Sequence, residues 1–306
     1  MASFEGRDII SIRDFDKKEI LSVLNAASDK LLKIDGKNPL DGKILATLFF
    51  EPSTRTRLSF ETAMLRLGGK VIGFADSDVS SSKKGETLQD AVRVISGYSD
   101  CIVIRHHLDG AARLAAEVSE NPVINGGDGA NQHPTQTFQD LYTILKSKGR
   151  LEGLKVGFLG DLTYGRTVHS LVYALSHFDT DMFFISPESL KMSEEVIDEL
   201  KEQDMNFKEG ASLEEFLGDL DVLYVTRIQK ERFPDVMDYE RVRGTYRLDE
   251  SILADSKPDL TIMHPLPRVD EISTSIDGHD QAMYFEQAMY GIPVRQALLG
   301  LIFGVI

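Results

Sequence analysis

The sequence predicts an α/β protein of two doubly wound parallel-sheet domains, with an active site in the cleft between them. First, its short apolar runs are continuous rather than alternating, which is typical of parallel strands covered on both faces. Second, stretches with helical spacing separate these runs, as in βα units. Third, 306 residues exceed the usual size of one domain.

The first half of the chain contains one βα array. Apolar residues recur at helical spacing over 59–67, and Gly68-Gly69 ends that helix. A second helix over 109–119 ends before Pro122. The runs predicted to be strands are 43–50, 70–76, 100–106 and 122–127.

A second array follows a polar segment at 146–153, with helices near 166–178 and 193–203. Its predicted strands are 155–161, 181–187, 221–227 and 259–267. A last helix, roughly 284–303, has no strand left to follow, so we expect it to fold back on the first domain. With the boundary placed in a helix around 134–148, the expected domains are 1–133 plus 285–306, and 134–284.

The composition excludes several classes of protein. A net charge of −15, from 34 basic and 49 acidic residues, argues against binding to nucleic acid or to an anionic membrane. The N-terminus has no apolar signal core, no run approaches a membrane span, and Cys/His zinc spacings are absent. The single cysteine, Cys101, lies in the apolar run "DCIVIRHH" and is predicted to be buried. We therefore expect a cytoplasmic protein without a bound metal.

Polar residues follow the predicted strands at their carboxyl ends, where open parallel sheets bind ligands. In "LFFEPSTRTRLSFE" (48–61), a strand turns into a helix that is predicted to start just after Ser53. Free N–H groups, three hydroxyls and an arginine there could hold a phosphate, although the arginines could instead pair with Glu51 or Glu61. The segment is not a Walker A loop, because it has no Gly-Lys-Ser/Thr. The residues of this cradle are Ser53, Thr54, Arg55 and Thr56.

Other helix starts carry further candidates. In "GDLTYGRTVHS" the glycine spacing does not match a dinucleotide fingerprint, so we expect no nicotinamide cofactor, and Arg166 becomes a candidate for binding a carboxylate. In "NQHPTQTF" a proline fixes a helix start beside His133 and Gln136. His133 is either a neutral donor to a carbonyl oxygen or a capping residue. The loop "SSSKKGET" (80–87) carries Ser80 and Lys84 and could simply be exposed.

Taken in order, "STRTR", "SFE", "RH…GAARLA", "NQHPTQ" and "HPLPR" resemble the aspartate/ornithine carbamoyltransferase family. The resemblance extends almost to the end of the chain, through "GIPVRQALL". The sequence departs from the common pattern at His107, Gly126 and Ala130, none of which is a ligand-binding position in the family.

Within the family, ornithine-specific members carry His-Cys-Leu-Pro where this chain has "HPLP" at 264–267. The stretch "YVTRIQKERF" resembles the aspartate-specific members, and the two carboxylates of aspartate need two cationic groups. The resemblance thus implies transfer of a carbamoyl group from carbamoyl phosphate to L-aspartate, an early step of pyrimidine biosynthesis. The alternatives are an ornithine or other amino-acid carbamoyltransferase, or a non-catalytic anion-binding paralogue.

The resemblance also implies roles for individual residues, with no cofactor and no metal. The catalytic donors would be Arg55, Thr56, Arg105 and His133. Carbamoyl phosphate would be bound by Ser53, Thr54, Arg55, Thr56, Arg105, His133, Gln136, Leu266 and Pro267. Aspartate would be bound by Lys84, Arg166, Arg227 and Gln229.

The family also implies an assembly of catalytic chains. Members form homotrimers, in which Ser80 and Lys84 would reach the active site of the adjacent subunit. The sequence leaves open whether regulatory chains join the trimer, whether allosteric effectors act on it, and whether substrate binding is cooperative.

Overall fold

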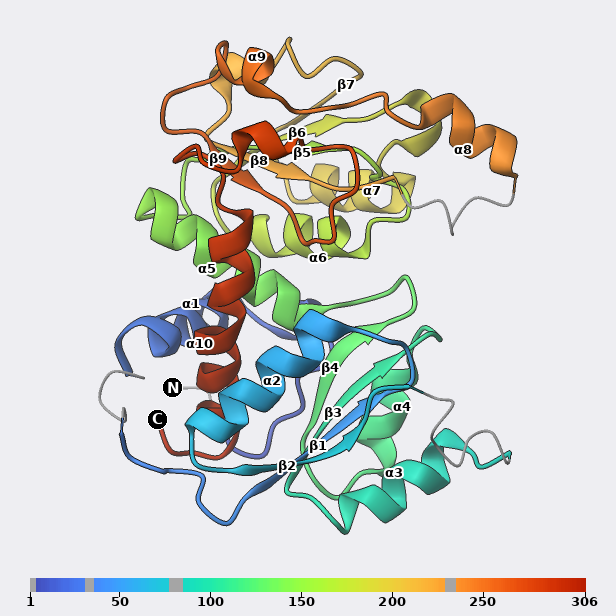
Figure 1. Cartoon of the computed structure of the whole chain (residues 1–306), viewed down its shortest axis with the longest axis vertical. Helices are drawn as coiled ribbons and strands as arrows, with labels where there is room; N and C mark the ends of the chain where they lie inside the picture. Colours follow the sequence, from blue (N-terminus) through green and yellow to red (C-terminus); the bar gives the residue numbers. More distant parts are fainter. Residues whose placement is uncertain (1–3, 31–35, 77–84, 229–234) are drawn as a thin grey trace. The chain divides into compact units, whose positions relative to one another are not determined.

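The computed structural model describes residues 4–30, 36–76, 85–228 and 235–306. The chain divides into two compact units, one formed within 1–142 and 290–306, the other within 143–289. Each unit contains one parallel sheet with helices packed on it (Figure 1). The predicted α/β class, with two parallel-sheet domains, is therefore confirmed.

The first unit contains a four-stranded parallel sheet of order β2-β1-β3-β4. Its strands are β1 (Ile44–Phe49), β2 (Lys70–Phe74), β3 (Cys101–His106) and β4 (Val123–Asp128). Its helices are α1 (Lys17–Asn25), α2 (Thr54–Arg66), α3 (Leu88–Ser96), α4 (Ala111–Val118), the start of α5 (Pro134–Lys148) and the end of α10 (Tyr284–Ile302). Short turns of helix lie at Ile12–Asp14 and Ala26–Lys30.

The core of this unit follows from its apolar runs. Residues of β1 and β3 are almost all buried, and Ala46 and Ile102 pack in one cluster with Val92 of α3 and Ala115 of α4. Cys101, at the start of β3, is fully buried as predicted. The edge strand β2 is the exception, because most of its residues are partly or fully exposed.

The second unit contains a five-stranded parallel sheet of order β7-β6-β5-β8-β9. Its strands are β5 (Lys155–Leu159), β6 (Asp181–Ile185), β7 (Phe207–Gly210), β8 (Val222–Val225) and β9 (Thr261–Met263). Its helices are α6 (Arg166–Leu175), α7 (Glu194–Glu202), α8 (Val236–Val242) and α9 (Glu250–Leu253), with turns at Glu188–Leu190, Leu217–Asp219 and Thr274–Ile276.

Two details of this unit correct the sequence prediction. The strand expected over 259–267 ends at Met263, because Leu266 has a φ of 53°, outside the extended region. The edge strand β7 was not predicted, since its sequence "FKEG" contains no apolar run.

Each sheet contains one point where the direction of strand addition reverses. In the first unit the chain adds β2 on one side of β1 and then crosses to add β3 and β4 on the other. In the second it adds β6 and β7 beside β5 and then crosses to add β8 and β9. Ligands of open α/β sheets bind at the carboxyl ends of strands beside such a switch point. The switch points lie between β1 and β3 and between β5 and β8.

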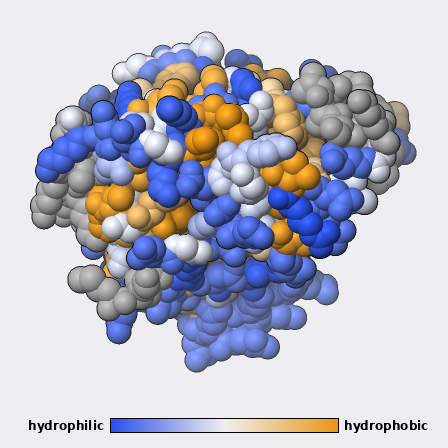
Figure 2. Space-filling model, turned by 90° about the horizontal axis from the view of Figure 1, so that it is seen from below, coloured by the Kyte–Doolittle hydropathy of each residue, from blue (hydrophilic) through white to orange (hydrophobic). Residues whose placement is uncertain are grey.

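The face shown in Figure 2 is mainly hydrophilic, with smaller apolar patches. Several exposed apolar side chains belong to the first unit, namely Leu58 and Leu65 of α2, Ile72 of β2, Val94 of α3, and Tyr98. Among the helices that the structure describes, none combines the length and apolar character needed to cross a membrane.

Candidate functional site

The first switch point carries the predicted phosphate cradle. Helix α2 begins at Thr54, directly after β1, and Ser53 occupies its N-cap position as the sequence predicted. The Ser53 side chain makes no capping hydrogen bond. Its hydroxyl and the first N–H groups of α2 therefore remain able to bind an anion.

Two arginines meet at this switch point. Arg105, at the end of β3, donates from Nη2 to Glu51 Oε1 over 3.1 Å and from Nη1 to Gly126 O over 3.2 Å. Partial desolvation lowers the pKa of Arg55, and the positive charge of Arg105 lowers it further. The sequence suggested Glu51 and Glu61 as partners of the arginines. Glu51 pairs with Arg105 and Glu61 lies near Arg57, so among the described residues neither of these acids pairs with Arg55. Two neighbouring guanidinium groups with one carboxylate favour the arrival of an anion.

The start of α5 supplies the next predicted residues. His133 immediately precedes Pro134, the first residue of this helix, and His133 Nε2 lies 3.5 Å from Thr56 Oγ1 of α2. Both side chains are buried. Gln136 is also buried, and its Nε2 donates to Asp140 Oδ1 over 2.7 Å. The structure thus brings Thr56 and His133 together, with Gln136 one helical turn further along.

The second switch point carries the predicted aspartate-binding arginines. Arg166 is the first residue of α6, after β5, and Arg227 follows β8. The two strands approach closely here, since a Cβ on Gly160 (φ +117°) would lie 2.3 Å from Thr226 O. Arg227 also lines a cavity together with Tyr239, Arg243, Tyr246 and Glu271. A partly buried cation beside a cavity suits the recognition of a carboxylate.

A buried His–Glu pair organises the turn after β9 that contains Leu266 and Pro267. Leu266 N donates to His264 Nδ1 over 2.8 Å, and His264 Nε2 lies 2.7 Å from Glu271 Oε1. Because Nδ1 accepts a hydrogen bond, the proton of a neutral ring resides on Nε2 and is donated to Glu271. Burial lowers the pKa of His264, and the Glu271 contact opposes this only in part.

Some predicted residues are not tested by this geometry. Ser80, Lys84 and Gln229 lie outside the described residues. Sequence reasoning also missed residues that support the predicted ones, namely Glu271 behind His264 and Asp140 behind Gln136. The four-residue spacing from Gln136 to Asp140 on a helix was a usable signal for the second pair. Among the described residues, no group of three or more His, Cys, Asp or Glu side chains could hold a metal ion.

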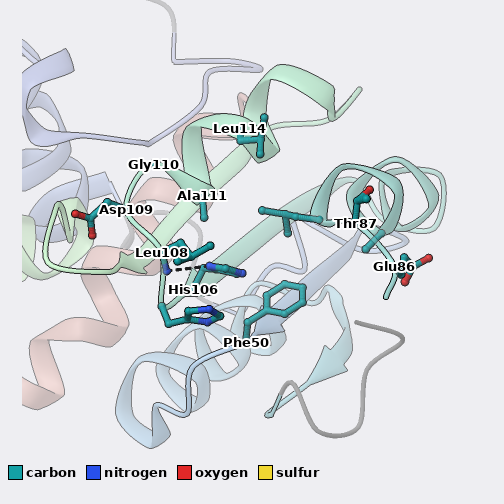
Figure 3. A pocket seen from close by; sticks show the side chains of 12 residues that line it. Phe50, Glu86, Thr87, His106, Leu108, Asp109, Gly110, Ala111 and Leu114 are labelled. Carbon is teal, nitrogen blue, oxygen red and sulfur yellow. Dashed lines mark hydrogen bonds between the residues drawn. The ribbon is translucent and has the colours of Figure 1, made fainter. Parts of the chain in front are cut away.

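A separate cavity of about 420 Å³ lies in the first unit (Figure 3). Phe50 and His106 line it at the carboxyl ends of β1 and β3, and Thr87 lies at the start of α3. Leu108 lies in the loop before α4, and Leu114 lies within that helix. The dashed line in Figure 3 is the hydrogen bond from Leu108 N to His106 Nδ1, 3.0 Å long. None of the residues predicted from the sequence to bind a ligand lines this cavity.

Comparison with family models defines the class of protein to which this fold and site belong. The carbamoyl-phosphate-binding domain of aspartate/ornithine carbamoyltransferases matches residues 7–146, and the Asp/Orn-binding domain matches residues 152–302. The chain belongs to the aspartate/ornithine carbamoyltransferase family.

Within this family, the similar proteins reported below are all aspartate carbamoyltransferases. The aspartate carbamoyltransferase catalytic subunit of Thermococcus onnurineus is 56% identical over 306 residues, covering 99% of each chain. The crystal structure of the M. jannaschii aspartate transcarbamoylase catalytic subunit has a TM-score of 0.90 at 54% identity, covering 97% of this chain and 98% of that one. Trypanosoma cruzi aspartate transcarbamoylase, solved with carbamoyl phosphate and aspartate, has a TM-score of 0.91 at 38% identity and covers 97% and 96%.

Proposed function

We propose that the protein transfers the carbamoyl group of carbamoyl phosphate to the amine of L-aspartate, giving N-carbamoyl-L-aspartate and phosphate. The observation that carries this proposal is the placement of arginines at both topological switch points. Arg55 and Arg105 flank the switch between β1 and β3, while Arg166 and Arg227 flank the switch between β5 and β8. One substrate is an acyl phosphate and the other a dicarboxylate, so both sites must attract anions. The relatives named above have the same activity in their names.

The chemistry follows from these residue types. The aspartate amine attacks the carbamoyl carbon, the bond to the phosphate oxygen breaks, and phosphate leaves. Thr56, Arg105 and His133 would donate to the carbamoyl oxygen as negative charge develops on it, and loss of one such donor typically costs about 2.7–4 kcal/mol. The departing phosphate can accept the amine proton, so no side-chain base is needed.

The arginines have a second role, because the two anionic substrates repel one another. Holding both in a reactive orientation can lower the barrier by up to about 7–11 kcal/mol. We assign carbamoyl phosphate to Ser53, Thr54, Arg55, Thr56, Arg105, His133, Gln136, Leu266 and Pro267. We assign aspartate to Lys84, Arg166, Arg227 and Gln229. The cleft between the domains, where the reaction requires the two sets to meet, remains a prediction.

We also propose a cytoplasmic homotrimer in which Ser80 and Lys84 complete the site of the adjacent subunit. Membership of the aspartate/ornithine carbamoyltransferase family supports this proposal. Association with regulatory chains stays an open question that the native mass of the purified protein, alone and from its host, would answer.

A substrate panel tests the proposed activity. Purified protein is incubated with carbamoyl phosphate and either L-aspartate or L-ornithine, and carbamoylated product and phosphate are measured. We expect turnover with aspartate only. Turnover with ornithine alone would establish the alternative carbamoyltransferase, and binding of carbamoyl phosphate without turnover of either amino acid would indicate a non-catalytic anion-binding chain.

A further inference from the structure

The residues that line the cavity of the first unit have no part in the proposed mechanism (Figure 3). The volume of this cavity, about 420 Å³, lies within the range of about 300–1,000 Å³ that is typical of small-molecule sites. Most of its lining is apolar, and the apolar side chains are Phe50, Leu88, Ala91, Leu108, Ala111 and Leu114. An apolar cavity of this size favours a ligand that carries apolar surface.

One buried polar side chain faces this cavity. His106, at the end of β3, is 8% exposed. Its Nδ1 accepts a hydrogen bond from Leu108 N over 3.0 Å, and its Nε2 lies on the other side of the ring, toward the cavity (Figure 3). Among the described residues, Nε2 has no hydrogen-bond partner. Because buried polar groups in proteins are nearly always paired, a partner from outside the chain is indicated.

The ring of His106 presents this nitrogen as a donor in a fixed direction. Because Nδ1 accepts a hydrogen bond, it carries no proton, and the proton of the neutral ring resides on Nε2. Burial lowers the pKa of His106, and the charge of His107 lowers it further, against the opposing effect of two nearby carboxylates. The His106 ring is stacked on that of His107, with centroids 4.4 Å apart, and its centroid lies 5.1 Å from that of the Phe50 ring. These two contacts restrict its rotation.

The charges around the cavity favour a neutral ligand. The acidic residues among its described lining are Glu86 and Asp109, and both are exposed. No Lys or Arg is among the described residues that line it, so an anion would find no cation to replace its hydration. A cation would face the Nε2–H group of His106, which can only donate. A neutral carbonyl oxygen accepts a hydrogen bond from that group without either penalty.

We propose that this cavity binds a neutral small molecule with an apolar, ring-sized body and a carbonyl oxygen that accepts a hydrogen bond from His106 Nε2. The site is separate from the phosphate cradle but adjoins it. Phe50 and His106 are the sequence neighbours of Glu51 and Arg105, whose ion pair lies at the first switch point. The inference does not depend on the proposed function, because no described residue of either substrate set lines the cavity.

The test uses two probes of nearly the same shape. Acetophenone has a phenyl ring and a carbonyl oxygen, and α-methylstyrene has a CH₂ group in place of that oxygen. We measure the dissociation constant of each probe for the purified protein by ligand-observed NMR. Both probes should bind the wild-type protein. The ratio of their dissociation constants reports the effect of the oxygen, because the rest of the two molecules is the same.

Substitutions of His106 test the hydrogen bond. In His106→Asn, the shorter side chain keeps an acceptor for Leu108 N but has no donor at the position of Nε2. We expect the ratio to shift about 3- to 10-fold in favour of α-methylstyrene, the range for one lost neutral hydrogen bond. His106→Gln places an N–H donor close to the position of Nε2 and should keep the wild-type ratio. An unchanged ratio in a folded His106→Asn protein overturns the proposal.

A cavity-filling variant tests the location. Leu114→Trp adds bulk within the cavity and should abolish the binding of both probes. Met237→Trp, at an exposed position of the second unit, is the matched control and should bind both probes as the wild type does. Wild-type affinity in a folded Leu114→Trp protein would place the probes elsewhere and overturn the proposal, as would a wild-type protein that binds neither probe. Thermal melting confirms that each variant is folded.

If His106→Asn or Leu114→Trp does not fold, a crystal structure of the wild-type protein soaked with acetophenone decides. A phenyl ring in the cavity, with its carbonyl oxygen at hydrogen-bond distance from His106 Nε2, supports the proposal. A ring elsewhere, or a carbonyl oxygen directed away from His106, overturns it. These outcomes are independent of turnover with aspartate, which tests the proposed function.

Discussion

At the scale of single residues, the pair of arginines at the first switch point carries the most specific chemical information. Arg105 has a carboxylate partner in Glu51, but Arg55 lies near a like charge and has none among the described residues. Two neighbouring positive charges repel each other, and such perturbed groups are typical of functional sites, where a bound anion would relieve the repulsion. We therefore regard Arg55 as the residue aimed at the leaving phosphate.

Replacing Arg55 by Ala should lower kcat at least about 100-fold and leave the fold intact, because one charged donor to the leaving group is lost. Steady-state kinetics and thermal melting check this. Arg66→Ala, in the last turn of the same helix, removes an exposed arginine and serves as the matched control. Near-native kcat in Arg55→Ala would show that the phosphate cradle lies elsewhere.

The His264–Glu271 pair predicts a pH dependence of stability. Burial lowers the pKa of His264, while hydrogen bonds from His264 and the backbone hold the pKa of Glu271 low against the effect of burial. For a group whose pKa is lower in the folded state, the unfolded chain binds protons first as the pH falls. The stability contribution is therefore present above the unfolded pKa and is lost in acid.

We expect the free energy of unfolding to decrease as the pH falls below about 6.5, the ordinary pKa of histidine. The double variant His264→Asn/Glu271→Gln removes both titrating groups and keeps an acceptor for Leu266 N. Its free energy of unfolding, measured by denaturant titration between pH 7 and pH 5, should decline less than that of the wild type. Parallel declines would show that other groups dominate this pH range.

At the scale of secondary-structure elements, the proposed function depends on the residues at the carboxyl ends of β1, β3, β5 and β8. These four strands flank the two switch points, and each is followed by or ends in a predicted arginine. Parallel pairing places these strand ends side by side within each sheet, so residues far apart in sequence converge. If each sheet binds one of the two substrates, as proposed, a substitution in one sheet should affect the kinetics of one substrate only.

Arg227→Ala should raise the KM for aspartate about 10- to 100-fold, the range for a lost charge-assisted hydrogen bond, and barely change the affinity for carbamoyl phosphate. Initial rates with each substrate varied in turn measure the two effects. Gln229→Ala should show a weaker version, since it offers a neutral hydrogen bond. Arg150→Ala, at an exposed position of the same unit, is the control. An equal loss for both substrates would mean that Arg227 contacts a different ligand.

At the scale of the whole molecule, the proposal of shared active sites predicts complementation. Inactive Lys84→Ala and Arg55→Ala chains are mixed in equal amounts, dissociated and reassembled. In a closed cyclic trimer, about a quarter of the sites would then combine an intact Arg55 with an intact Lys84 from the neighbouring chain. Activity should recover to that fraction of the wild type, whereas mixtures without subunit exchange stay inactive. No recovery after demonstrated exchange would place Lys84 in its own chain's site.

Most strands and several helices could be predicted from the sequence, because buried parallel strands are continuous apolar runs and α2, α5 and α6 begin at recognisable residues. The helices α1 and α3 were missed although Asp16 and Thr87 cap their starts. The edge strand β7 was missed because it has no apolar run, and the strand expected through residue 267 stops at Met263. A local sequence pattern cannot show where a strand ends when packing against the rest of the domain determines that end.

The sequence by itself determined the class of protein and the chemistry of its candidate ligands, because contiguous motifs display the hydroxyls, arginines and histidine directly. Only the tertiary structure decided how those groups are held. Gln136 donates to Asp140 one turn further along α5, and Arg295 of α10, far away in the sequence, is buried against Phe60 of α2 and Gln139 of α5. Burial gives these charges their effect, since an exposed carboxylate or guanidinium would be satisfied by water, and burial exists only once the units have folded.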